Sequence, residues 1–188
     1  MAQNIITRKS SSVETPSFIT MLLTDKRFAL LWLPIRVWLG LQWIEAGSHK
    51  VTDAAWVKTG LALKGFWTGA IQIPAEGRPP IAYAWYREFL QTMLDTQAYT
   101  WFAKVVAYGE ILIGIALILG VFIGMTAAIG GFLNWNFIMA GSASVNGMFL
   151  AISILLVLAW KIAGYIGVDY LLLPRISKLW SPAKIVEE

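Results

Sequence analysis

The chain has 188 residues, of which 57% are hydrophobic and only 14% are charged. A soluble domain usually carries about 25% charged residues and about 45–50% apolar ones, so this composition indicates an integral membrane protein of one domain. The chain has no cysteine and one histidine. This excludes disulfides, iron–sulfur clusters, thiolate zinc sites and a bis-histidine haem, and it argues against a metal site. The net charge of +4 accompanies no nucleic-acid motif.

Residues 1–24 form a polar stretch, in which no apolar core follows the early basic pair Arg8 and Lys9. We therefore expect a polar N-terminal tail and not a cleavable signal. A membrane domain over 25–172 follows it, and 173–188 is predicted to form a C-terminal tail.

Four stretches are apolar enough to cross about 30 Å of hydrocarbon, and each must be helical to satisfy its own backbone. They are residues 28–47, 99–120, 122–140 and 147–168. The second and third stretches meet at 120–122, which predicts a tight antiparallel hairpin. The fold class expected is all-α: an integral membrane four-helix bundle.

The first and second spans are separated by a long segment, residues 48–98. Residues 79–99, PPIAYAWYREFLQTMLDTQAY, place aromatic and aliphatic side chains at helical spacing, which predicts an amphipathic helix at the membrane interface. The segment is thus a long, partly helical interfacial loop, and it acts either as a cap over the bundle or as a lid over a site.

An even number of spans puts both termini on one side of the membrane. The two ends carry seven Lys and Arg residues against five in the long loop, which favours cytoplasmic termini.

Two ionisable residues fall near the middle of the first two spans, Arg36 and Glu110. Such groups cost about 2.5–3.5 kcal/mol in a membrane, so each needs a partner or a purpose. We expect the two side chains to form a buried ion pair, because the midpoints of antiparallel spans share one depth. Small residues on the same faces, among them Gly40 and Gly114, would let the backbones approach. The pair either only fixes helix register or also holds an anion or a quinone oxygen.

A second polar group lies nearer the outer surface: Glu45, His49, Lys50, Lys104, Asn134 and Asn136. Asn134 and Asn136 are about 200° apart on a helix, so at least one amide should face inward. Lys50 either joins the group or extends to the interface, and His49 either joins it or is a boundary residue. With a roof of Trp56, Trp67, Trp85 and Tyr86, these residues predict an outward-facing polar pocket. The small residues at 141–144 predict a turn that fits tightly beneath the long loop.

Three strings resemble the DoxX/DoxD family of small four-helix membrane proteins. They are LNWNFIMAGSASVN (133–146), GEILIGIALILG (109–120) and RVWLGLQWIEAGSHK (36–50). The first is fairly specific, whereas the other two gain weight from their order and spacing. The resemblance covers about residues 28–172.

The resemblance implies a membrane component of a quinone-linked oxidoreductase system, similar to the DoxD subunit of thiosulfate:quinone oxidoreductase, in a prokaryotic plasma membrane. The candidate substrate or quinone pocket then comprises Arg36, Glu45, His49, Lys104, Glu110, Asn134 and Asn136. We expect quinone as the ligand, no covalently bound cofactor, and lipids, a small oxyanion and other redox subunits as partners. The alternative is a non-catalytic accessory or assembly subunit of a larger respiratory or photosynthetic complex. No residue in the chain stores electrons, which favours dependence on a partner.

Overall fold

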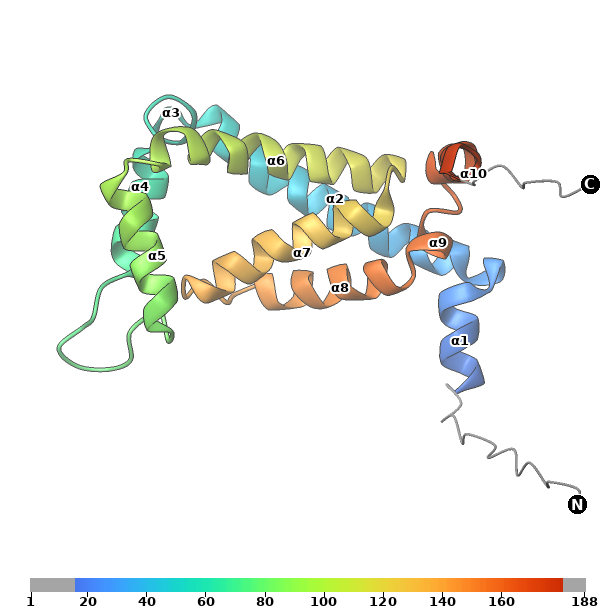
Figure 1. Ribbon diagram of the computed structural model, residues 1–188, viewed down its shortest axis with the longest axis horizontal. Helices are drawn as coiled ribbons and strands as arrows, with labels where there is room; N and C mark the ends of the chain where they lie inside the picture. Colours follow the sequence, from blue (N-terminus) through green and yellow to red (C-terminus); the bar gives the residue numbers. More distant parts are fainter. Residues whose placement is uncertain (1–15, 181–188) are drawn as a thin grey trace, which may run out of the picture.

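The computed structural model describes residues 16–180, and this part of the chain is all-helical, without strands (Figure 1). The all-α class expected from the sequence is therefore confirmed. The long helices are α2 (Ala29–Thr52), α6 (Tyr99–Leu119), α7 (Ile123–Met139) and α8 (Asn146–Leu158). The shorter ones are α1 (Ser17–Thr24), the 3-10 turn η1 (Lys26–Phe28), α3 (Ala54–Val57), α4 (Leu61–Ala70), α5 (Ala84–Asp95), α9 (Trp160–Ala163) and α10 (Asp169–Trp180).

Helices α2 and α6 pack side by side and antiparallel, and glycines allow their backbones to approach closely (Figure 1). A Cβ on Gly114 would lie 2.5 Å from the carbonyl oxygen of Gly40, and one on Gly47 would lie 3.0 Å from the carbonyl oxygen of Ala107. No larger residue fits at these positions without moving a backbone. The small-residue faces predicted for the first two spans are therefore confirmed as the contact between these helices.

Helices α7 and α8 form a second antiparallel pair, in which Gly131 lies against Ser153. A tight turn at Gly120, with φ of 75°, reverses the chain between α6 and α7. From this hairpin α6 and α7 diverge as a wedge toward the opposite end of the molecule, where α4 and α5 lie across its mouth (Figure 1).

The segment between α2 and α6 is mostly helical, since it forms α3, α4 and α5. The helix predicted within 79–99 is present as α5. Tyr86 and Leu90 lie one turn apart on its buried face, at 3% and 2% exposure, whereas Trp85 is exposed.

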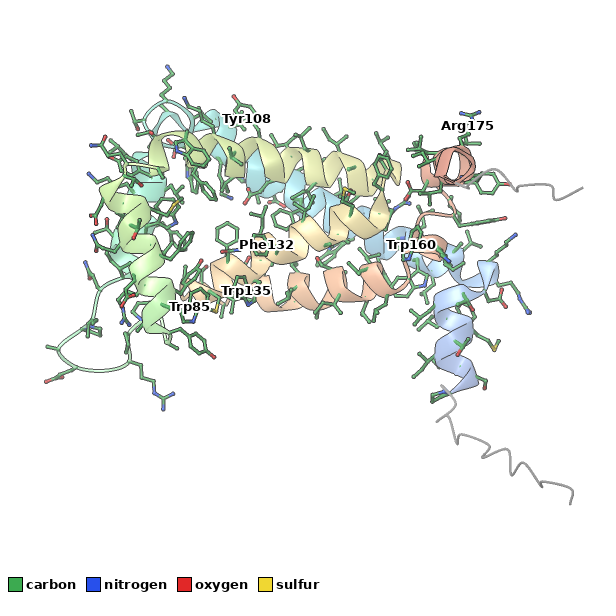
Figure 2. The ribbon with its side chains drawn as sticks, viewed as in Figure 1. Trp85, Tyr108, Phe132, Trp135, Trp160 and Arg175 are labelled. Carbon is green, nitrogen blue, oxygen red and sulfur yellow. The ribbon has the colours of Figure 1, made fainter. Side chains whose placement is uncertain are left out.

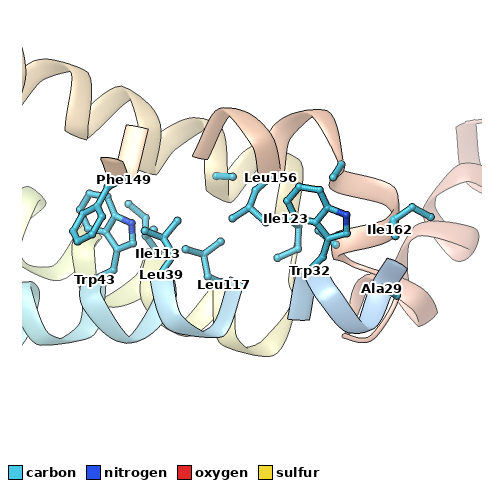
Figure 3. Close-up of a cluster of buried hydrophobic side chains, with 13 residues drawn as sticks. Ala29, Trp32, Leu39, Trp43, Ile113, Leu117, Ile123, Phe149, Leu156 and Ile162 are labelled. Atoms are coloured by element: carbon cyan, nitrogen blue, oxygen red, sulfur yellow. The ribbon is translucent and has the colours of Figure 1, made fainter. Parts of the chain in front are cut away.

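Two hydrophobic clusters fill the molecule. The larger lies between the long helices and contains Trp32, Leu39, Trp43, Leu117 and Leu156 (Figure 3). The smaller lies beneath α4 and α5 and joins Leu63, Trp67, Ile81, Tyr86, Leu90 and Tyr99 with Ala103 and Ala140. The segment that forms α3, α4 and α5, called the cap below, thus shares a core with the adjoining ends of α6 and α7.

Two predicted boundaries differ from the structure. The fourth span was expected over 147–168 as one helix, but α8 ends at Leu158 and the short α9 ends at Ala163. In the turn that follows, a Cβ on Gly164 would lie 2.8 Å from a carboxylate oxygen of Asp169, and one on Gly167 would lie 2.9 Å from the guanidinium of Arg36. The first helix, expected to end at 47, continues to Thr52.

The predicted tails are also partly structured. Within 1–24, α1 forms, its Leu22 and Leu23 pack on the core, and the carbonyl oxygen of Leu22 accepts a hydrogen bond from Trp32 Nε1 at 2.9 Å. At the other end, α10 crosses the expected boundary at 172. The remaining tail residues, 1–15 and 181–188, lie outside the described residues.

Among residues 16–180, one helix is both long and apolar enough to cross a membrane by length and composition, namely Tyr99–Leu119. Ile123–Met139 and Asn146–Leu158 are shorter apolar helices. Helix α2 has the length but carries Arg36, Glu45 and Lys50.

Candidate ligand cavity and neighbouring ion pair

A cavity of about 250 Å³ occupies the wedge between α6 and α7 beneath the cap. Its lining is aliphatic and aromatic apart from Tyr86 and Asn136. Helices α4 and α5 contribute Leu63, Phe66, Trp67, Tyr86, Phe89, Leu90 and Met93, and α6 and α7 with the following residue contribute Phe102, Val106, Phe132, Leu133, Asn136, Phe137 and Ala140. An apolar site with few polar groups is the usual form of a small-molecule pocket.

Tyr86 and Asn136 provide the polar edge of this cavity. The Tyr86 hydroxyl donates toward Asn136 Oδ1 and toward the Asn136 carbonyl oxygen, each at 3.1 Å, and Asn136 Nδ2 donates to the carbonyl oxygen of Phe132 at 2.8 Å. Burial raises the pKa of Tyr86 to about 12. The phenol is therefore neutral at ordinary pH, and its one proton could turn from Asn136 to a ligand oxygen.

An ion pair lies beside the cavity. Lys50 Nζ is 2.6 Å from Glu110 Oε2, and the side chains are 18% and 1% exposed. The same ammonium lies 5.3 Å from the ring centroid of Trp56 and 5.9 Å from that of Phe137. Phe137 also lines the cavity, so this aromatic ring lies near both the ammonium and the ligand space.

The prediction of an ion pair between Arg36 and Glu110 is wrong. Arg36 donates to three backbone carbonyl oxygens: Ala163 at 2.8 Å, Ile166 at 2.9 Å and Ile118 at 3.3 Å. The contact of Gly40 with Gly114 sets a register in which Arg36 lies opposite Ile118. Glu110 lies eight residues before Ile118, which is about 12 Å away along the axis of α6. Arg36 thus belongs to the far end of the bundle, where it holds the turn after α9 against the end of α6.

Asp169 is the residue that the sequence reasoning missed. It is 1% exposed, and its two carboxylate oxygens accept hydrogen bonds from the backbone N–H groups of Phe122 at 2.6 Å and Ile123 at 2.8 Å. These N–H groups begin α7, so Asp169 satisfies donors that the helix itself cannot. The available signal was an acidic residue just after a glycine-containing apolar segment, at the expected end of the fourth span.

The other predicted pocket residues do not converge on the cavity. Glu45, His49 and Lys104 are exposed. Asn134 is 1% exposed within the bundle, and its amide has no hydrogen-bond partner in the described part of the chain. Of the seven candidates, only Asn136 lines the cavity. Glu110 is connected to the lining through Lys50, whose ammonium lies 5.9 Å from the Phe137 ring centroid. The cavity is therefore apolar, where a polar pocket was expected.

The aromatic roof is confirmed in part. Trp67 and Tyr86 line the cavity, whereas Trp56 lies over Lys50 and Trp85 is exposed. The tight turn beneath the long loop is confirmed at Gly141, where φ is 87° and an added Cβ would lie 2.7 Å from Cβ of Pro80.

No group of three or more His, Asp and Glu side chains within 16–180 is arranged to hold a metal ion. Comparisons with protein-family models, with curated proteins and with solved structures found no match to this chain.

Proposed function

We propose that this chain is a multi-pass membrane protein that binds the ring of a quinone in the cavity beneath α4 and α5, as the membrane component of a quinone-linked oxidoreductase system. In this proposal α2, α6, α7 and α8 with α9 cross a prokaryotic plasma membrane, and both termini are cytoplasmic. The cap then lies at the outer surface. The resemblance of three sequence strings to the DoxX/DoxD family supports the same class.

The observation that carries the proposal is the chemistry of the cavity lining. A quinone ring is flat and apolar, with carbonyl oxygens that accept hydrogen bonds at opposite edges. The cavity of about 250 Å³ offers aromatic rings from Trp67, Phe102 and Phe137 and two neutral polar groups, the Tyr86 hydroxyl and the Asn136 amide. Aromatic rings with a few neutral polar groups match such a ring better than they match a charged solute.

The outer surface of the long helices supports a membrane setting. Large apolar side chains are exposed along them, including Leu30 at 72%, Leu112 at 65% and Met125 at 64%. The ionisable groups Arg36 and Glu110 are instead each 1% exposed and partnered, as intramembrane charges must be.

The donor of electrons belongs to a partner in this proposal. The chain holds no cysteine and one histidine, so it has no residues for an iron–sulfur cluster or a bis-histidine haem. The cavity lining contains no lysine or arginine to hold an oxyanion such as thiosulfate. A second subunit would bind the donor and pass electrons to the quinone at the cavity.

The test is binding of a tail-free quinone, 2,3-dimethoxy-5-methyl-1,4-benzoquinone, to the purified chain in lipid nanodiscs, followed by quenching of tryptophan fluorescence. Val106→Phe fills the cavity, because Val106 lines it at 4% exposure. Its matched control is Val105→Phe, because Val105 is the next residue on α6 but is 55% exposed.

We expect saturable binding that Val106→Phe abolishes and Val105→Phe leaves unchanged. Tyr86→Phe removes one hydrogen bond, which should weaken binding about tenfold. Absence of saturable binding, or equal binding by both valine variants, would overturn the proposed function. Binding that persists while the chain alone fails to reduce the quinone with thiosulfate would place the donor with a partner.

A further inference from the structure

A groove of about 430 Å³ lies on the surface of the molecule between α7 and α8. Its floor includes the small residues Ala127, Ala128 and Gly131, and its walls include Trp135, Ile154 and Leu158. Ser153 also borders it, but this residue is 1% exposed and packs against Gly131, so it adds little polar surface. The groove is therefore apolar, and it is open because the side chains on its floor are small.

The groove and the ligand cavity share one lining residue, Phe132. Phe132 lines both spaces, is 61% exposed, and stacks on Trp135 with ring centroids 5.8 Å apart. Figure 2 shows Phe132 and Trp135 on the half of α7 that lies toward α5, near Trp85. A molecule in the cavity that displaced the Phe132 ring would therefore meet the groove.

The groove also runs in the direction that a lipid-borne molecule requires. From Trp135 to Ala127 it follows α7 for eight residues, or about 12 Å, away from the cap. In the proposed membrane setting, this is the direction from the outer interface toward the middle of the bilayer. A ring held under the cap would have its chain pointing into the hydrocarbon.

We propose that the groove binds the long apolar tail of the quinone whose ring occupies the cavity, so that the natural ligand is a long-chain, membrane-dissolved quinone that enters sideways from the bilayer past Phe132. This inference rests on the proposed function. It adds the ligand class and the route of entry. A water-soluble ring compound would leave the groove without a role.

The test compares two probes, the tail-free benzoquinone named above and the same ring with a decyl chain. Ala128→Phe blocks the groove, because Ala128 is an exposed residue of its floor. Ala151→Phe is the matched control, because Ala151 is an exposed residue of α8 that does not border the groove. Ala128→Leu provides a milder block if the phenylalanine variant folds poorly.

In the wild type, we expect the decyl compound to bind about tenfold tighter than the tail-free ring, since close packing in the groove adds to affinity. Ala128→Phe should remove most of this advantage and leave the affinity of the tail-free ring unchanged, whereas Ala151→Phe should change neither. Comparing variants in the same nanodiscs cancels the partitioning of the decyl chain into lipid.

The outcomes separate the two proposals. If the tail-free ring binds and the decyl advantage survives in Ala128→Phe and Ala128→Leu, the tail inference is wrong while the proposed function stands; an ordinary lipid chain or a second copy would then cover the groove. If neither compound binds the wild type, the proposed function fails and the tail inference fails with it.

Discussion

The ammonium of Lys50 lies 2.6 Å from the carboxylate of Glu110, and this contact joins the last turn of α2 to the middle of α6. Glu110 is 1% exposed, so Lys50 is the cation that compensates its charge. The rings of Trp56 and Phe137 enclose the ammonium and connect the pair to the cap on one side and to the ligand cavity on the other. The pair thus links helix packing to the shape of the candidate site.

Removing one partner of this ion pair should destabilise the protein strongly. Lys50→Met leaves a buried carboxylate without its cation, which typically costs about 3–5 kcal/mol in free energy of unfolding. Glu110→Met should cost less, because the side chain of Lys50 is 18% exposed and can turn toward water. Denaturant unfolding in a mild detergent measures both.

The double variant Lys50→Met with Glu110→Met is the control for this prediction. It leaves no uncompensated charge, so it should be more stable than Lys50→Met alone. A double variant that loses as much stability as the two single variants together would show that the pair contributes no coupling.

A second prediction is that Arg36 and Glu110 contribute to stability independently. Arg36→Gln removes charge-assisted hydrogen bonds to three carbonyl oxygens, at a cost of at least about 3 kcal/mol. Because Glu110 lies elsewhere along α6, Arg36→Gln and Glu110→Gln should act additively to within about 0.5 kcal/mol. Arg36→Lys is a milder variant for the same cycle. A coupling energy well above that limit would mean that the two side chains interact directly after all.

The sequence predicted which helix faces pack together better than it predicted which charged side chains pair. Gly40 and Gly114 could be assigned to facing surfaces, because small residues at helical spacing point to close packing whatever the axial register. The pairing of Arg36 with Glu110 needed that register to be correct within one turn. Hydropathy placed the end of the first helix at 47, whereas the polar residues that follow remain helical as far as Thr52. Because the helix continues past 47, Lys50 lies within reach of Glu110.

The cavity was predictable only in part, for a related reason. Tyr86 and Trp67 could be expected above the bundle, because they lie on apolar faces of the long loop. That Asn136 would meet Tyr86, whereas Asn134 would be buried among helices, depends on the rotation of α7, which the sequence pattern left open. Asp169 and its hydrogen bonds to the start of α7 join residues 46 and 47 positions apart, which no local pattern reveals.

A third prediction concerns pH. Burial raises the pKa of Tyr86 from its ordinary value of 10 to about 12. Because the folded-state pKa exceeds the unfolded one, the neutral phenol stabilises the fold fully below pH 10, and this contribution is lost as the pH rises to 12. In that window the wild type should lose stability more steeply than Tyr86→Phe, although the variant should be about 1 kcal/mol less stable at neutral pH. Equal pH slopes for the two proteins would contradict this assignment.

The last prediction uses two glycines of α6 with opposite surroundings. A Cβ on Gly114 would lie 2.5 Å from the carbonyl oxygen of Gly40 and 2.9 Å from the backbone nitrogen of Ile44, so Gly114→Ala must push α2 away and should cost about 1–3 kcal/mol. A Cβ on Gly109 would meet nothing within 4 Å, so Gly109→Ala should raise helix stability by about 0.5–1 kcal/mol. Both are glycine-to-alanine changes in one helix, so they share the same effect on the unfolded chain, and their difference isolates the packing of α2 on α6. Thermal unfolding should therefore shift in opposite directions, and a Gly114→Ala protein as stable as the wild type would mean that the two helices do not approach this closely.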